Sequence, residues 1–259
     1  MRVLVLGSGG KDSSYATWWS MMRGWDVAGI VTVRITDSDS MMFQVPSTAL
    51  AGLQAASAGI PWLPISFEGE QDSEMRNLEL ALQSFIPGSR KKLADTWSNE
   101  EIESALWPKG WVWPEQLIRL RPDQAIDALV VGALRSDYQK TRIERMCHRL
   151  GIKSFCPLWH HNGVKHMRDL IAHNHVIMMT SVTADGLGEE WLGRTLDVES
   201  LNELERLADE YRFHVDGEGG EFETAVLDAP WMSRSIKTQH TTHWTGRRGW
   251  LDIWAAELV

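Results

Sequence analysis

The sequence predicts an α/β protein whose first half holds a parallel β-sheet covered by helices on both faces. Strand-like and helix-like segments alternate over residues 1–67. The strands are almost continuously apolar, which is typical of strands buried on both faces of a sheet. Near residue 158 the pattern changes toward segments that resemble antiparallel strands. We therefore expect two domains, residues 1–158 and a smaller α+β domain over residues 159–259.

The first domain begins with a regular βαβαβ pattern. Its predicted elements are the strands 3–6, 27–33 and 62–67 and the helices 13–23 and 46–58. Residues from about 87 to 122 break the pattern, and we interpret them as an insertion. They contain the basic cluster 90–92 and the block WPKGWVWP at 107–114, a candidate docking surface. The pattern resumes with the strands 128–131 and 153–156.

A well-marked helix lies between these last two strands. Ser136 and Gln139 have the spacing of a capping box, and Gly151 is a typical C-terminal stop. Apolar residues recur at helical spacing, at Ile143, Met146, Cys147 and Leu150. Tyr138, Gln139 and Arg142 lie mostly off this apolar stripe, at the end of the helix nearest the strand.

The second domain is expected to alternate less regularly. Its predicted helices lie at 164–174, near 189–192 and at 198–211. Its predicted strands lie at 176–181, 212–215, 235–240 and 249–258, the last two joined by a polar loop at 241–248.

Composition limits the functional classes. The chain of 259 residues has a formal net charge of −9, which argues against an extended nucleic-acid interface, since such an interface needs a basic face. No apolar run approaches the length of a membrane span, and the N-terminus has no basic leader, so we expect a cytoplasmic protein without a membrane partner. Cys147 and Cys156 have no metal-binding spacing, and we expect two reduced, buried thiols.

The segment SGGKDS at 8–13 follows the first predicted strand and precedes the first helix. Backbone N–H groups and the positive end of a helix dipole at such a point favour an anion. The segment is not a Walker A loop, because Val5 and Asp12 stand where that motif needs a glycine and a hydroxyl. It is not a dinucleotide-binding loop either, because Asp12 would replace the third glycine.

The remaining composition suits a leaving pyrophosphate. Ser8, Ser13 and the loop amides can donate to phosphoryl oxygens, Lys11 can neutralise charge, and Asp12 can reach a Mg²⁺ ion. The segment resembles the pyrophosphate loop of the N-type ATP pyrophosphatases, which split ATP into AMP and pyrophosphate. The resemblance implies a HUP-like (adenine nucleotide alpha hydrolase-like) ATP-binding domain, with ATP and Mg²⁺ bound at Gly7, Ser8, Gly9, Gly10, Lys11, Asp12, Ser13, Val33 and Gly132.

Further segments resemble one branch of this superfamily. They are GALRSDYQKTRIE at 132–144, PLW at 157–159, WLGR at 191–194, GEGGEFET at 217–224 and, more loosely, MFQVPS at 42–47. Together they are similar to the diphthine–ammonia ligase family. In MFQVPS, Gln44 and Ser47 differ from the His and Asn frequent in that family, and the role of this loop stays open.

The resemblance implies an activity. Such enzymes amidate the carboxylate of diphthine on elongation factor 2 with ATP and ammonium. Because a carboxylate is a poor acyl donor, it must first attack ATP to form an acyl adenylate, which ammonia then converts into the amide. The enzyme chiefly positions the reactants and neutralises their charge. On this hypothesis the catalytic residues are Lys11, Asp12, Tyr138, Gln139, Arg142 and Glu221.

The segment GEGGEFET has a separate interpretation. Glu218, Glu221 and Glu223 repel one another unless a cation lies among them. Diphthine carries a trimethylammonium group and the nucleophile arrives as ammonium, so either could be that cation. The expected substrate-binding residues are Ser136, Asp137, Glu218, Gly219, Gly220, Glu223 and Thr224.

Two alternatives stay open at this point. One is an N-type ATP pyrophosphatase that modifies tRNA, for example by thiolation. The other is an adenine-nucleotide-binding sensor without turnover. The oligomeric state cannot be predicted from the sequence.

Overall fold

The computed structural model describes residues 1–35, 45–67, 71–83, 108, 110–115, 117–121, 125–132 and 137–259. Within these ranges it gives no side-chain description for residues 35, 45–47, 67, 71–74, 138 and 139. Most of the predicted insertion and the basic cluster 90–92 lie outside the described residues, as does Gln44 of MFQVPS.

The first sheet contains five parallel strands in the order β3-β2-β1-β4-β5. They are β1 (Arg2–Leu6), β2 (Asp26–Ile35), β3 (Trp62–Phe67), β4 (Ala128–Val131) and β5 (Lys153–Phe155). Their bounds lie close to the predicted ones, because continuous apolar runs of this length are stable only when both faces are covered. The predicted α/β fold class with a parallel sheet is confirmed.

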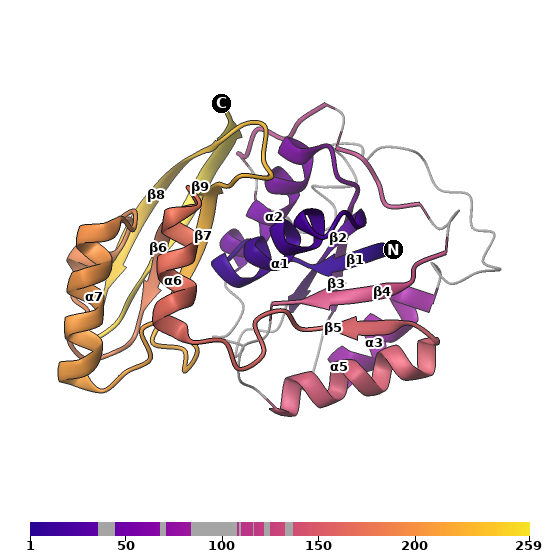
Figure 1. The fold of residues 1–259 in the computed structure, drawn as a ribbon. Helices are drawn as coiled ribbons and strands as arrows, with labels where there is room; N and C mark the ends of the chain where they lie inside the picture. Colours follow the sequence, from indigo (N-terminus) through magenta and orange to yellow (C-terminus); the bar gives the residue numbers. More distant parts are fainter. Residues whose placement is uncertain are drawn as a thin grey trace.

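Helices cover both faces of this sheet (Figure 1). On one face α1 (Lys11–Met22) and α2 (Val45–Ala58) share a core with Val3 and Val5 of β1. On the other face α3 (Gln71–Gln83) and α5 (Asp137–Leu150) share a second core with Leu4. Successive side chains of a strand point to opposite faces, so β1 contributes to both cores. The helix α3 was not predicted.

The second unit is an antiparallel sheet with helices. Its strands are β6 (Val176–Val182), β7 (Phe222–Asp228), β8 (Ile236–Trp244) and β9 (Gly249–Leu258), in the order β7-β6-β9-β8. The helices α6 (Gly163–Ala172) and α7 (Val198–Tyr211) lie side by side, and η1 (Glu189–Trp191) is a 3₁₀ turn (Figure 1).

Three predictions in this unit were wrong in detail. Residues 212–215 form no strand, because Arg212 adopts a left-handed conformation (φ 60°) that ends α7. The edge strand β7 was not predicted; its first three residues belong to GEGGEFET, which we interpret as a carboxylate-rich loop. The strand β8 extends to Trp244, which leaves 245–248 as the connection.

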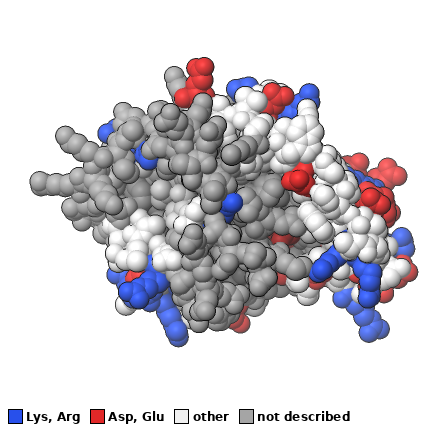
Figure 2. Space-filling view, turned by 180° about the vertical axis from the view of Figure 1, so that it is seen from behind, with Lys and Arg blue, Asp and Glu red and all other residues white. Residues whose placement is uncertain are grey.

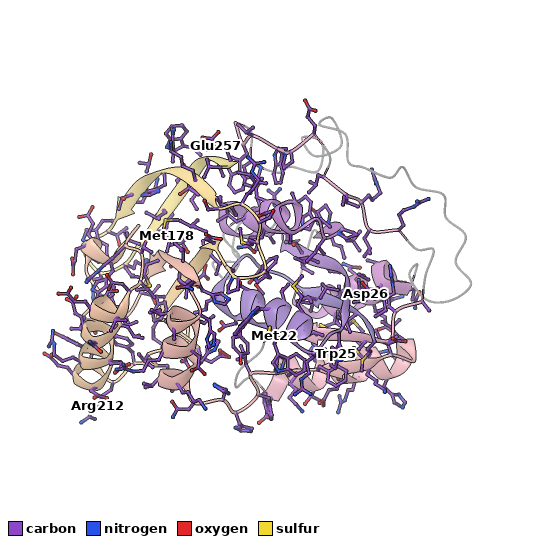
Figure 3. All side chains as sticks on the ribbon, turned by 45° about the horizontal axis from the view of Figure 1, so that its top comes forward. Met22, Trp25, Asp26, Met178, Arg212 and Glu257 are labelled. Carbon is purple, nitrogen blue, oxygen red and sulfur yellow. The ribbon has the colours of Figure 1, made fainter. Side chains whose placement is uncertain are left out.

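The two units are packed against each other. The helix α2 contacts β7 and β9, and buried residues of both units form one continuous core. Side chains fill the space between the units (Figure 3), where Met178 marks the second sheet and Met22 the end of α1. Trp111 also joins the units: its indole N–H donates to Ile253 O at 3.2 Å. Trp111 of the predicted docking block is therefore buried rather than presented to a partner.

No helix within the described ranges is long and apolar enough to cross a membrane.

Candidate functional site

The glycine loop connects the carboxyl end of β1 to α1, at the edge of the sheet where ligands of open α/β folds bind. Gly9 has a φ of 82°, a conformation that favours glycine. A Cβ on Gly7 would overlap the side chain of Ile30. The Ser13 hydroxyl donates to Gly10 O at 3.0 Å and accepts from Ser8 N–H at 3.2 Å. These contacts fix the loop in a tight turn.

The turn is suited to an anion. The backbone N–H groups of Asp12 and Ser13 lie in the first turn of α1 and, among the described residues, donate to no acceptor. The helix dipole places partial positive charge at the same point. Lys11 adds a full charge beside them. These donors match the phosphate groups of ATP, so the residues present fit that substrate.

Lys11, Asp12 and His166 form a line of charged and polar groups. The Lys11 Nζ contacts Asp12 Oδ2 at 2.8 Å, and His166 Nε2 contacts Asp12 Oδ1 at 2.8 Å. The side chains of Lys11 and His166 are buried, whereas that of Asp12 is 27% exposed. Burial pushes the pKa of Asp12 upward, but Lys11 and His166 outweigh it, so the net pKa lies below the usual value. Asp12 is therefore a carboxylate that is held in place and reachable by a cation.

Strand β7 of the second unit lies against the glycine loop. Lys11 N–H donates to Thr224 Oγ1 at 3.3 Å across 213 residues of sequence, and Val226 N–H donates to Gly9 O at 2.9 Å. Gln54 on α2 donates its amide group to Gly9 O at 3.0 Å and to Val226 O at 2.7 Å. The segments SGGKDS and GEGGEFET, predicted separately, thus meet in one site.

Gln54 and His166 contact the glycine loop but were not predicted from the sequence. Each lies in a helix of otherwise ordinary composition, and no motif of the sequence marks either residue. Only the folded chain brings them to the loop.

The three carboxylates of GEGGEFET have different surroundings. Glu221 accepts hydrogen bonds from His214 N–H at 2.9 Å and Gly219 N–H at 2.7 Å, so its carboxylate stabilises the turn that precedes β7. The Glu218 N–H contacts Asp216 Oδ1 at 3.4 Å in the same turn. Glu223 lies on β7, where burial raises its pKa to about 7 while the charge of Lys11 lowers it. The charge of Lys11 in the glycine loop thus acts on Glu223.

The predicted residues of α5 are only partly described. Ser136 and the side chains of Tyr138 and Gln139 lie outside the described residues. Asp137 is exposed at the start of the helix. Arg142 lines an open cavity of about 510 Å³ between α3 and α5, together with Met75, Arg76, Glu79, Leu80, Gln83, Arg145 and Arg149. Lys and Arg gather over these helices on the face that Figure 2 shows.

The remaining predicted residues belong to the frame of the site. Gly132 ends β4 beside the backbone of Asp12, and Val33 lies on β2 opposite Ile65. No group of three or more His, Cys, Asp or Glu suited to a metal ion occurs in the part of the chain that the structure describes.

The fold and the loop define a class: an α/β protein with a parallel sheet, whose anion-suited glycine loop is completed by a second, antiparallel unit. Comparison with known proteins gives the family. The model of the diphthamide synthase N-terminal domain matches residues 1–89 and 114–154, and that of the diphthamide synthase C-terminal domain matches residues 162–259. The chain belongs to the diphthamide synthase family.

Individual relatives agree. The diphthine–ammonia ligase of Rattus norvegicus is 30% identical over 244 residues, which cover 91% of this chain and 82% of that protein. The Homo sapiens enzyme of the same name is 29% identical over the same coverage. The one from Schizosaccharomyces pombe is 30% identical and matches over 36% of its length. The predicted resemblance and the prediction of an enzyme of the ATP-dependent ligase class are confirmed.

A solved structure is also similar to this chain. It is described as a predicted subunit of a tRNA methyltransferase from Methanocaldococcus jannaschii, is 18% identical and covers 89% of this chain and 98% of that one. The TM-score is 0.38.

Proposed function

We propose that this protein amidates the carboxylate of diphthine on elongation factor 2, with ammonium as the nitrogen donor and ATP as the activating substrate. The diphthine carboxylate attacks the α-phosphorus of ATP, which forms an acyl adenylate and releases pyrophosphate. Ammonia then attacks the carbonyl and releases AMP. Membership of the diphthamide synthase family supports the acceptor, and the glycine loop supports the use of ATP.

The observation that carries the proposal is the contact between the glycine loop and β7. The Lys11 N–H donates to Thr224 Oγ1, so the loop suited to phosphates and the family-specific segment share one site. A reaction that joins ATP to a second substrate needs this juxtaposition, because positioning supplies much of the rate acceleration.

We assign roles to the loop residues accordingly. Residues 8–13 hold the leaving pyrophosphate through their hydroxyl and N–H groups. Lys11 neutralises charge on the phosphates, and Asp12 binds Mg²⁺, which when bound would reduce the repulsion between the phosphates and the attacking carboxylate. Val33 frames the adenosine. Gly132 allows the glycine loop to adopt its position, because its backbone lies close to that of Asp12.

We assign the acceptor to the side of the site formed by β7 and the start of α5. Thr224 contacts the glycine loop from β7, Glu223 is its neighbour on the strand and is under the charge of Lys11, and the turn 217–221 precedes them. Ser136, Asp137, Tyr138, Gln139 and Arg142 keep their proposed roles near the start of α5. Among the three glutamates, Glu223 is our candidate for the partner of ammonium or of the trimethylammonium group, because the carboxylate of Glu221 is engaged in its own turn.

The proposal is tested by incubating the protein with ATP, Mg²⁺, ammonium and elongation factor 2 that carries diphthine. We expect AMP formation that depends on the factor, together with a mass decrease of about one unit, because amidation replaces a hydroxyl by an amine. The variant Asp12→Asn should lose both signals. Arg206→Ala, on the exposed face of α7, is the matched control and should keep them.

Three outcomes would contradict the proposal. Pyrophosphate release that requires tRNA instead of elongation factor 2 would favour a tRNA-modifying enzyme. ATP binding without turnover on either substrate would favour a nucleotide sensor. AMP formation without the mass change would mean another acceptor.

A further inference from the structure

The carboxylate of Asp12 has a partner on each of its oxygens. Lys11 from the same loop contacts Oδ2, and His166 from the second unit contacts Oδ1, each at 2.8 Å. The two contacts differ in what can happen to them. The ammonium group of Lys11 lies at the end of a flexible side chain, whereas the imidazole ring of His166 is fixed by the side chains around it.

His166 is completely buried in the second turn of α6. Its ring packs edge-on against Tyr15 with centroids 5.1 Å apart, and against His161 with centroids 6.0 Å apart. Its Nδ1 is buried and has no hydrogen-bond partner among the described residues. The Nε2–Asp12 contact is therefore the one polar contact of this ring in the described part of the chain, and packing aims the ring at Asp12.

Binding of a phosphate group changes the balance at Asp12. Lys11 is the cation of the loop, and a phosphate that arrives at the first turn of α1 competes with Asp12 for its ammonium group. Once Lys11 turns to the phosphate, Asp12 Oδ2 loses its partner and Oδ1 keeps His166. The carboxylate then stays in one orientation, with Oδ2 available to a cation on the phosphates.

We propose that His166 is a positioning residue of the nucleotide site: it holds the Asp12 carboxylate in the orientation that receives Mg²⁺ together with ATP. The second unit is therefore part of the nucleotide site as well as a unit for the acceptor. The proposal rests on the proposed use of ATP, but it does not depend on which acceptor is activated. A partner that orients a metal-binding side chain typically contributes about 10- to 100-fold in metal affinity.

Binding of ATP to the full-length protein tests this proposal, measured by titration calorimetry with Mg²⁺ and again with EDTA. We expect His166→Leu to weaken ATP binding at least about 10-fold with Mg²⁺ and less than about 3-fold without it. His166→Gln, whose amide N–H can replace that of Nε2, should recover binding to within about 3-fold of the wild type. His175→Leu is the matched control: it also removes a buried histidine of the same region, and its ATP affinity should not change.

The opposite results overturn the proposal. They are unchanged Mg²⁺-dependent binding in His166→Leu, or an equal loss with and without Mg²⁺, which would mean a purely structural bond between the units. If His166→Leu does not fold, the Mg²⁺-dependent ATP affinity of His166→Asn is compared with that of His166→Gln. The shorter amide of Asn cannot reach Asp12, so equal ATP affinity in these two variants would overturn the proposal. These titrations contain no elongation factor. Their outcome therefore does not depend on whether the protein amidates diphthine.

Discussion

Gly132 and Asp12 approach each other through their backbones at the carboxyl edge of the first sheet. A Cβ at position 132 would lie 2.6 Å from the carbonyl carbon and oxygen of Asp12 and 2.9 Å from Ser13 N. Real Cβ atoms do not approach backbone atoms this closely, and backbone cannot turn away as a flexible side chain can. The end of β4 thus sets the position of the first turn of α1.

Gly132→Ala should therefore displace the glycine loop. We expect ATP affinity to fall at least about 10-fold, because a misplaced binding group loses most of its contribution. Titration calorimetry checks this. Gly59→Ala is the control: Gly59 has a φ of 64° but nothing within 4 Å of its Cβ, so the variant should lose about 1 kcal/mol of stability and no ATP affinity. Equal ATP affinity in Gly132→Ala and the wild type would contradict the close approach.

Glu223 should make stability depend on pH. Burial raises its pKa from 4.5 to about 7, despite the lowering effect of Lys11. A raised pKa means that the native state binds the proton more tightly than the unfolded state. The contribution of this proton to the free energy of unfolding is therefore fully present below pH 4.5 and is lost as the pH rises through about 7. Glu223→Gln cannot lose a proton. Relative to the wild type, its free energy of unfolding should gain about 1 to 3 kcal/mol between pH 5 and pH 8, as measured by urea unfolding. A constant difference over this range would show that Glu223 titrates normally.

Glu221 should act on the turn before β7 rather than on ammonium. Glu221→Ala removes the acceptor of His214 N–H and Gly219 N–H, and we expect a loss of about 1 kcal/mol of stability, since water can replace part of each exposed bond. The KM for ammonium should stay within about twofold of the wild type, because we expect the Glu221 carboxylate to make no contact with ammonium. Loss of a charge-assisted contact with ammonium would raise this KM by more than twofold. A large rise in this KM without a loss of stability would return Glu221 to the site.

His175 should make the protein sensitive to acid. Burial lowers its pKa from 6.5 to about 4, beside Trp18 at a ring-centroid distance of 5.6 Å. A lowered pKa means that the unfolded state takes up the proton first, so this contribution is present above pH 6.5 and is lost as the pH falls toward 4.

The variant His175→Leu lacks this titration. Between pH 7 and pH 4.5 it should lose about 1 to 3 kcal/mol less stability than the wild type, as measured by urea unfolding. Parallel losses in the two proteins would rule out His175 as a source of acid sensitivity.

The two cysteines should differ in reactivity. Burial raises the pKa of the Cys147 thiol to about 12 and also raises that of Cys156, which is only half-buried. Because the thiolate is the reactive form, a thiol reagent at pH 8 should label Cys156 slowly in the native protein and Cys147 only after unfolding. Rapid labelling of both thiols without denaturant would contradict this burial.

The sequence by itself determined the first sheet and the loop that follows its first strand. Apolar strands, helical periodicity and SGGKDS are local patterns, and the spacing of apolar residues within a segment shows which of its faces must be buried. The same patterns failed at β7, whose alternation is weak beside the glutamates of GEGGEFET, and at residues 212–215, where Arg212 ends a helix through a left-handed conformation.

Only the tertiary structure decided which residues complete the site. His166 and Gln54 reach the glycine loop because α6 and α2 pack against it, and no feature of their local sequence records that packing. The sequence does not distinguish the glutamates of GEGGEFET from one another. In the structure, two backbone N–H groups donate to the carboxylate of Glu221, and burial raises the pKa of Glu223. The physical reason is that burial and most of these partners depend on residues far apart in the chain, such as Asp12 and His166, which meet only in the folded protein.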